Sequence, residues 1–310
     1  MVLVPALVKT KSGELVYSLT ANDFSITDNG IEQKVMLDEA SDQQPLALVV
    51  AIQNGDVSPR QFHALRGMGT MLEAIVGDRP HQVALVTFAK QPQLISGFTP
   101  DLSKITGAIQ HLTTEGDGAA ILDATAYSLK LLERQPKESR RCILLISEMR
   151  DQGSLIPLKE VVSEIGESNT VIYSLAFSSL RARLKDDLTG PGRENPKIQL
   201  AHDLPPTPDY LDISAAIGLA VDALRKNTAS NLAQLTGGEY LGFSNQQNLD
   251  SDLNTIANHL PNRYLLSFQP VSPQPGLHSI AVKVKGHPDF AVSARTRYWA
   301  AGDTNRQHAR

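Results

Sequence analysis

The chain has 310 residues, 41% of them hydrophobic, and its 29 basic and 33 acidic residues give a net charge of −4, which disfavours nucleic acid or an anionic membrane as partner. Its single cysteine, Cys142, excludes an internal disulfide and a cysteine-rich metal site, and apolar runs such as residues 46–52 are too short to span a bilayer. This length and composition predict a soluble, globular protein of about two structural units.

The N-terminal part is predicted to form β structure. Two runs of alternating polar and apolar residues flank Asn29-Gly30, which is the strongest short hairpin signal because both turn residues need a positive φ. The predicted strands cover residues 2–8, 24–28 and 31–37, and an acidic linker follows at 38–44.

After Pro45 the pattern changes to strands that alternate with helices. Continuous apolar runs are typical of strands buried on both faces, and apolar residues every three or four positions predict helices. The strands are expected at residues 46–52, 83–89, 142–147, 171–177 and 240–243, and the helices at 59–76, 120–132, 155–165, 210–235 and 249–260. We therefore expect an α/β fold with a doubly wound, mostly parallel six-stranded sheet. A proline-rich loop at 181–208 is expected to be functional or mobile.

The C-terminal part is again predicted to be β, with strands at 264–269, 278–285 and 290–298. Neither terminal β segment has enough strands to be stable alone, so we expect the two to pair as a small β unit. The predicted division is an N-terminal β segment at 1–44, an α/β domain at 45–262, a C-terminal β segment at 263–300 and a tail at 301–310.

The sequence contains no motif that indicates an enzyme. No phosphate-binding Gly-x-x-x-x-Gly-Lys loop, Gly-x-Ser-x-Gly nucleophile elbow or His-Glu-x-x-His metal motif occurs. Gly67-Met68-Gly69 lies within a helical pattern, which favours close packing over dinucleotide binding. Cys142 opens an apolar strand and is interpreted as a buried, inert thiol. We expect neither catalysis nor a cofactor.

Several segments resemble a von Willebrand factor type A domain. Residues 46–52 and 83–89 resemble its first strands, residues 115–124 its Gly-Gly-Thr turn and following helix, and residues 142–148 its fourth strand. The flanks narrow the resemblance to a bacterial kind that is abundant in acidobacteria. The segments similar to that kind are residues 19–30, 232–238, 263–268 and 294–300.

The resemblance implies a metal-ion-dependent adhesion site at the carboxyl edge of the sheet. In the family, an Asp-x-Ser-x-Ser motif, a threonine and a second aspartate surround Mg²⁺, and a partner's carboxylate completes the octahedron. The matching positions of this chain are Ala51, Gln53, Gly55, Ala119 and Glu148. We therefore expect a degenerate site that does not bind Mg²⁺ or Mn²⁺, since Mg²⁺ needs hard oxygen ligands at near-ideal positions. Two alternatives remain for the metal ligands. The motif could be shifted to Asn54-x-Asp56-x-Ser58, or Asp117 or Asp151 could substitute for a missing ligand.

The resemblance also implies a non-enzymatic interaction module that binds through the loops at this rim. The partner is expected to be an unidentified protein or surface ligand, bound without a metal. The candidate partner-binding residues are Gln53, Asn54, Asp56, Asp117, Glu148 and Asp151. The alternative is a structural or assembly subunit that binds through its β flanks or helix faces. Relatives with this layout commonly carry a secretion signal, so we expect an extracytoplasmic location, or a cytoplasmic one if Met1 is the authentic start.

Overall fold

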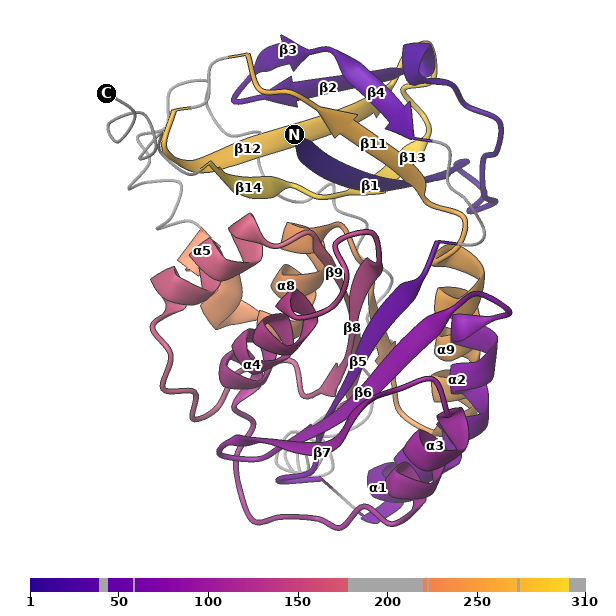
Figure 1. The fold of residues 1–310 in the computed structure, drawn as a ribbon, viewed down its shortest axis with the longest axis vertical. Helices are drawn as coiled ribbons and strands as arrows, with labels where there is room; N and C mark the ends of the chain where they lie inside the picture. The colour runs from indigo at the N-terminus through magenta and orange to yellow at the C-terminus, as the bar shows by residue number, and fades with distance from the viewer. Residues whose placement is uncertain (39–43, 58, 178–219, 222, 272–273, 301–310) are drawn as a thin grey trace, which may run out of the picture.

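The chain forms an α/β unit with a smaller β unit stacked on one end of it (Figure 1). The computed structural model describes residues 1–38, 44–57, 59–177, 220–221, 223–271 and 274–300. The expected loop at 181–208 and the tail at 301–310 lie outside these residues, as do residues 210–219 and 222 of the expected helix at 210–235. No helix in the described ranges combines the length and the apolar content needed to cross a bilayer.

The centre of the α/β unit is a six-stranded sheet with the order β10-β9-β8-β5-β6-β7. All neighbouring strands are parallel except β7, which runs antiparallel to β6 at the edge. The strands are β5 (Leu46–Gln53), β6 (His81–Phe88), β7 (Pro92–Thr99), β8 (Arg140–Ser147), β9 (Thr170–Phe177) and β10 (Tyr240–Phe243). The predicted fold class is confirmed, although β7 was not expected from its sequence, whose side chains are largely exposed.

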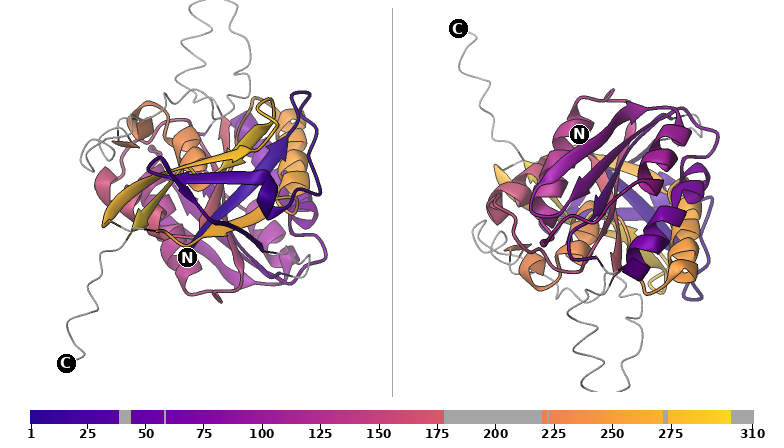
Figure 2. Two further views of the ribbon diagram at one scale, coloured as in Figure 1. Left: turned by 90° about the horizontal axis from the view of Figure 1, so that it is seen from above. Right: turned by 90° about the horizontal axis from the view of Figure 1, so that it is seen from below.

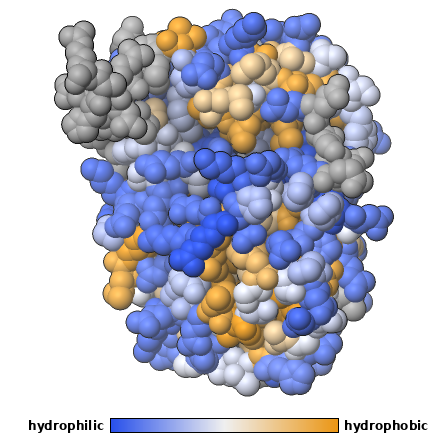
Figure 3. Space-filling model, viewed as in Figure 1, coloured by the Kyte–Doolittle hydropathy of each residue, from blue (hydrophilic) through white to orange (hydrophobic). Residues whose placement is uncertain are grey.

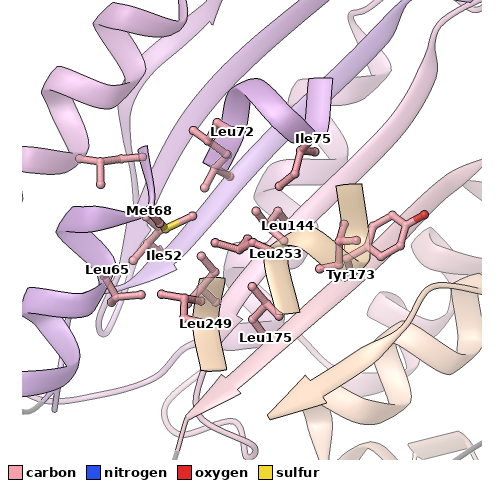
Figure 4. Packing of buried hydrophobic residues seen from close by; sticks show 14 of the residues in the cluster. Ile52, Leu65, Met68, Leu72, Ile75, Leu144, Tyr173, Leu175, Leu249 and Leu253 are labelled. Carbon is pink, nitrogen blue, oxygen red and sulfur yellow. The ribbon is translucent and has the colours of Figure 1, made fainter. Parts of the chain in front are cut away.

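Helices cover both faces of this sheet. Successive side chains of a strand point to opposite faces of the sheet. Leu48, Val50 and Ile52 of β5 therefore lie in one hydrophobic cluster, and Val49 and Ala51 lie in a second cluster on the other face. The first cluster contains α1 (Pro59–Gly67), α2 (Gly69–Val76), α3 (Leu102–Gln110) and α9 (Gln246–His259). The second contains α4 (Ile121–Glu133), α5 (Leu158–Glu167) and α8 (Thr228–Thr236). Figure 4 shows Leu65, Met68 and Leu72 from the helices facing the strands of the first cluster.

The helix predicted over residues 59–76 is divided at Met68 into α1 and α2. Gly69 lies directly after the break, and a Cβ atom there would be 2.4 Å from Thr106 Cγ2 of α3. A glycine is therefore needed for the two helices to approach so closely, which agrees with a packing role for the Gly67-Met68-Gly69 segment.

The β unit consists of two four-stranded sheets, each built from both ends of the chain. Their orders are β13-β1-β11-β4 and β14-β12-β2-β3. The strands are β1 (Val2–Lys9), β2 (Phe24–Asp28), β3 (Ile31–Gln33), β4 (Val35–Asp38), β11 (Tyr264–Phe268), β12 (Gly276–Val284), β13 (Ala291–Ala294) and β14 (Arg297–Ala300). A third hydrophobic cluster contains side chains from both sheets, including Val4, Phe24 and Phe268. The expected pairing of the terminal segments is therefore present.

Two strands that were predicted as single are each divided between these sheets. The strand predicted at 31–37 is divided into β3 and β4, and the strand predicted at 290–298 is divided into β13 and β14. A chain that passes from one sheet of a sandwich to the other must bend at the corner, and Lys34 and Arg295-Thr296 lie at these bends. The predicted hairpin at Asn29-Gly30 is confirmed, with φ values of 47° and 81°.

The β unit packs against the amino-terminal edge of the central sheet. Lys9 of β1 forms an ion pair of 2.9 Å with Glu239, which directly precedes β10. Arg295 donates hydrogen bonds to the carbonyl oxygens of Ile165 and Gly166 at the end of α5. The carboxyl-terminal edge lies at the opposite end of the molecule, away from the β unit (Figures 1 and 2).

Candidate functional site

Three loops meet at the carboxyl-terminal edge of the sheet. The first follows β5, the second precedes α4 and the third follows β8. Open α/β sheets bind ligands outside this edge, so the loops form the candidate site, which we call the rim. The rim includes the last residue of β5, Gln53, and its three loops cover residues 53–57 (counted from that residue), 115–120 and 148–155. All six predicted partner-binding residues lie in these loops.

Gln53 and Glu148 form the centre of the rim, and both side chains are buried. Gln53 Oε1 accepts a hydrogen bond of 2.8 Å from the backbone nitrogen of Glu148. Gln53 Nε2 donates to the carbonyl oxygen of Gly55 at 2.9 Å and lies 3.4 Å from Glu148 Oε1. Gln152 Nε2 donates to Glu148 Oε2 at 3.1 Å. These three side chains, which we call the rim clasp, join the first and third loops.

Asp56 joins the first loop to the second. Its backbone has a φ of 53°, unusual for a residue other than glycine, and its amide donates to the carbonyl oxygen of Gly116 at 3.1 Å. Its Oδ2 accepts a hydrogen bond of 3.0 Å from the amide of Gly118. Asn54 contributes through its backbone carbonyl, which accepts from the amide of Glu115 at 2.9 Å. Asp56 is thus held by the loops that it connects.

Asp151 caps the N-terminus of α4. The N-cap residue itself, Ala120, supplies no side-chain oxygen, so this end needs acceptors from elsewhere. Asp151 Oδ1 accepts from the amide of Leu122 at 3.0 Å, and Ser154 Oγ accepts from the amide of Asp123 at 3.1 Å. Asp123 in turn accepts from the amide of Ile156 at 2.9 Å. The sequence did not indicate the roles of Ser154 and Asp123, because this exchange joins segments about thirty residues apart.

The five positions that the sequence predicts to match the family's metal ligands lack most of the required side chains. Ala51, Gly55 and Ala119 have no side-chain oxygen, and Ala51 is fully buried in the second hydrophobic cluster. At Gly55 a Cβ atom would lie 2.6 Å from the carbonyl oxygen of Gly118, so a serine does not fit there. The amide oxygen of Gln53 already accepts a hydrogen bond. These residues therefore do not fit a Mg²⁺ ion of octahedral geometry.

The alternative ligand set is only partly described. Asp56 of the shifted motif uses its carboxylate to accept from Gly118, and Ser58 lies outside the described residues. Within the described ranges, no group of three or more histidine, cysteine, aspartate or glutamate side chains is placed to hold a metal ion.

An open hollow of about 420 Å³ lies on the outer surface of the rim. Its lining residues are Asp56, Lys90, Gln91, Asp117, Gly118, Gln152, Gly153 and Leu155. Leu155 is 80% exposed and Met149, in the same loop, is 40% exposed. Of the predicted partner-binding residues, Asp56 and Asp117 therefore reach the surface of this hollow, whereas Gln53, Asn54 and Glu148 are buried. The sequence reasoning missed Lys90 and Leu155.

Figure 3 shows one face of the molecule, which is largely hydrophilic, with one apolar patch over β7 and another over the β unit. Leu94 and Ile95 of that strand are each 43% exposed. These two residues lie on the edge strand and are not among the residues that line the rim hollow.

The order of the strands and a family match define the α/β unit as a von Willebrand factor type A fold. The family described as von Willebrand factor type A domain matches residues 51–151, which contain the three rim loops up to Asp151. Among curated proteins, no match was found.

A comparison with solved structures matched proteins from bacteria and from an animal at low sequence identity. The conserved hypothetical protein BatB from Bacteroides thetaiotaomicron is 12% identical, with a TM-score of 0.43, and the match covers 69% of this chain and 99% of that chain. An aerotolerance-related membrane protein from Bacteroides fragilis is 14% identical, with a TM-score of 0.41, and the match covers 69% of this chain and 98% of that chain. Proximal thread matrix protein 1 from the mussel byssus is 14% identical, with a TM-score of 0.46, and the match covers 76% of this chain and 50% of that chain.

Proposed function

We propose that the chain is a protein-interaction module that binds its partner through the rim, without catalysis and without a divalent cation. The observation that carries this proposal is the rim clasp. Gln53 and Glu148 stand at positions predicted to match the family's metal ligands, and the neutral amide of Gln53 pairs with the loop backbone there. The amide of Gln152 donates to the Glu148 carboxylate. Hydrogen bonds between the loops thus replace a cation as the element that holds the rim together.

The surface outside the clasp is suited to a polar protein contact with an apolar centre. The hollow offers the ammonium group of Lys90, the carboxylates of Asp56 and Asp117, and the exposed side chain of Leu155. Protein interfaces commonly combine such an apolar anchor with a surrounding polar rim. In the absence of a cation, Lys90 is the group that would pair with a carboxylate of the partner.

Site-specific photo-crosslinking tests this proposal in the source cell. A photoreactive amino acid replaces Leu155 in the rim or, as a control, Ile31 in the β unit, which is 59% exposed. We expect one partner to be captured from position 155 and not from position 31. We also expect the yield to be the same with Mg²⁺ and with EDTA. Met149→Asp should abolish capture, whereas Leu94→Asp on β7 should not.

Two outcomes would contradict the proposal. Capture of the same partner only from position 31 would favour the alternative function of an assembly subunit that binds through its β flanks. Loss of capture in EDTA would show that a cation is part of the interface.

We further propose an extracytoplasmic location. Its support is the resemblance of residues 19–30 and 232–238 to bacterial proteins that commonly carry a secretion signal. Fractionation of the source cell with an antibody against the chain tests this location, and recovery with cytoplasmic markers would contradict it.

A further inference from the structure

A cavity of about 700 Å³ lies between the β unit and the amino-terminal edge of the central sheet, at the end of that sheet opposite the rim. Its volume lies within the usual range for small-molecule sites in proteins, about 300–1,000 Å³. Strands of both units and Leu260, directly after α9, contribute to its walls, so it is separate from the rim and its loops.

The walls of this cavity are mainly apolar. Leu3 and Pro5 come from β1, Leu266 from β11 and Val171 from β9, and Leu260 follows α9. Leu260 and Leu266 are among the most buried side chains of their clusters. An occupant of this part of the cavity would therefore be an apolar chain or ring.

Charged residues of both signs also line the cavity, with an excess of positive charge. The cations are Lys137, Arg140, Arg141 and Arg263, and the anions are Asp38 and Glu138. The charge of Arg263 is compensated by Glu239, whose Oε2 lies 3.5 Å from its guanidinium, and its Nε donates to the Tyr173 hydroxyl.

Arg141 is not compensated in this way. One terminal nitrogen donates to the carbonyl oxygen of Gln135 at 2.9 Å, but its Nε is buried and has no hydrogen-bond partner. In the part of the chain that the structure describes, no carboxylate lies within ion-pair distance of it. A buried donor without an acceptor is unfavourable, and a guanidinium pairs best with a carboxylate.

We propose that this cavity binds an amphipathic monocarboxylate, with its apolar chain against the strands of the two units and its carboxylate paired with Arg141. The apolar walls select the body of the ligand, and the uncompensated guanidinium selects a negative head group over a neutral or positive one.

Titration calorimetry on the full chain tests the choice of ligand with three matched probes: decanoate, decanol and decyltrimethylammonium. We expect decanoate to bind at one site, about tenfold more tightly than decanol, because the charge-assisted hydrogen bond is lost in the alcohol. The cationic probe should not bind. Arg141→Gln should weaken decanoate by about tenfold and leave decanol unchanged. Arg79→Gln is the matched control, since Arg79 also has a buried Nε without a partner but does not line the cavity.

Cys142 reports the location of binding in the unmodified protein. It lines the cavity and is the chain's single cysteine. Because burial raises the pKa of its thiol to about 11, modification by the small reagent methyl methanethiosulfonate should be slow. Bound decanoate should slow the modification of Cys142 further. Val171→Trp, which places a larger side chain in the cavity, should abolish decanoate binding. Three results would overturn the proposal: no binding of decanoate, equal binding of decanol, or an unchanged rate at Cys142.

Discussion

Gln53 is fully buried, yet both polar atoms of its side-chain amide are paired with atoms of the rim. Its sequence position at the end of an apolar run was enough to place it at the rim beside Glu148, because parallel strands end at the same edge. The pairing itself could not be predicted. It depends on how closely two loops approach, and their residues are 95 positions apart in the sequence.

Replacing Gln53 tests whether the rim clasp stabilises the fold. Gln53→Ala should lower the free energy of unfolding by about 2–4 kcal/mol, because it leaves the amide of Glu148 buried and unpaired and opens a void. Urea denaturation measures this change. Gln91→Ala, at an exposed residue of the same hollow, should stay within about 0.5 kcal/mol of the parent chain. Equal stability of both variants would show that the clasp contributes nothing.

At the scale of single elements, patterns within one segment were predictable and contacts between segments were not. The hairpin at Asn29-Gly30 follows from local φ preferences, and β5 follows from its apolar run. The bends that divide β3 from β4 and β13 from β14 were missed, because they are set by the two packed sheets. The cap of α4 was also missed, because its acceptors, Asp151 and Ser154, belong to a loop distant in the sequence.

The cap of α4 predicts a structural effect for Asp151, which sequence reasoning placed among the partner-binding residues. Asp151→Ala should destabilise the chain by about 1 kcal/mol, since it removes one of the two acceptors of the Leu122 amide and also the acceptor of the Ser154 hydroxyl, which is the other. Hydrogen exchange at that amide should become faster. Asp117→Ala, at an exposed rim residue, should change neither quantity. An unchanged exchange rate in Asp151→Ala would contradict the capping role.

A buried hydrogen-bonded group joins three strands of the β unit and predicts a pH dependence. His278 Nδ1 lies 2.7 Å from Asp28 Oδ1, and its Nε2 lies 2.6 Å from the carbonyl oxygen of Gln274. The Tyr298 hydroxyl donates to Asp28 Oδ2 at 2.8 Å. The hydrogen bond to Asp28 raises the pKa of His278 above its usual 6.5, although burial opposes this. The imidazolium form is therefore favoured in the folded state.

The stabilisation by His278 should be fully present below pH 6.5 and be lost as the pH rises through its folded-state pKa. Urea denaturation between pH 6 and pH 9 should show this loss in the parent chain, and His278→Gln should flatten the profile. His287→Gln, at an exposed histidine of the same unit, should keep the parent profile. A profile for His278→Gln that parallels the parent chain would contradict this role.

At the scale of the whole molecule, one carboxylate connects the two units. Glu239 precedes β10 and contacts Lys9 of β1, His259 of α9 and Arg263, which precedes β11. Burial raises its pKa, but the His259 hydrogen bond and the charges of Arg263 and Lys9 outweigh this and lower the pKa from 4.5 to about 2. No local pattern predicted this contact, because Lys9 is 230 positions away from Glu239 and the other two partners follow a different strand and helix.

Glu239 should therefore support acid stability. Its contribution of about 3 kcal/mol should be present above pH 4.5 and be lost as the pH falls towards 2. Glu239→Gln should destabilise the chain at pH 7 and flatten the acid limb of the stability profile, measured by urea denaturation. The matched control is Glu133→Gln, at an exposed residue of α4, which should behave as the parent chain. An unchanged acid limb in Glu239→Gln would contradict the assignment.

Isothermal titration with Mn²⁺ and Mg²⁺ tests most directly whether the rim is held by hydrogen bonds instead of a cation. Melting curves recorded with and without EDTA accompany it. We expect no binding heat and no shift in Tm, because Ala51, Gly55 and Ala119 offer no side-chain oxygen and the Gln53 amide is already paired. Low-micromolar binding that disappears in Glu148→Ala would contradict this expectation, and would show that Asp56, Asp117 or Asp151 completes a metal site at the rim.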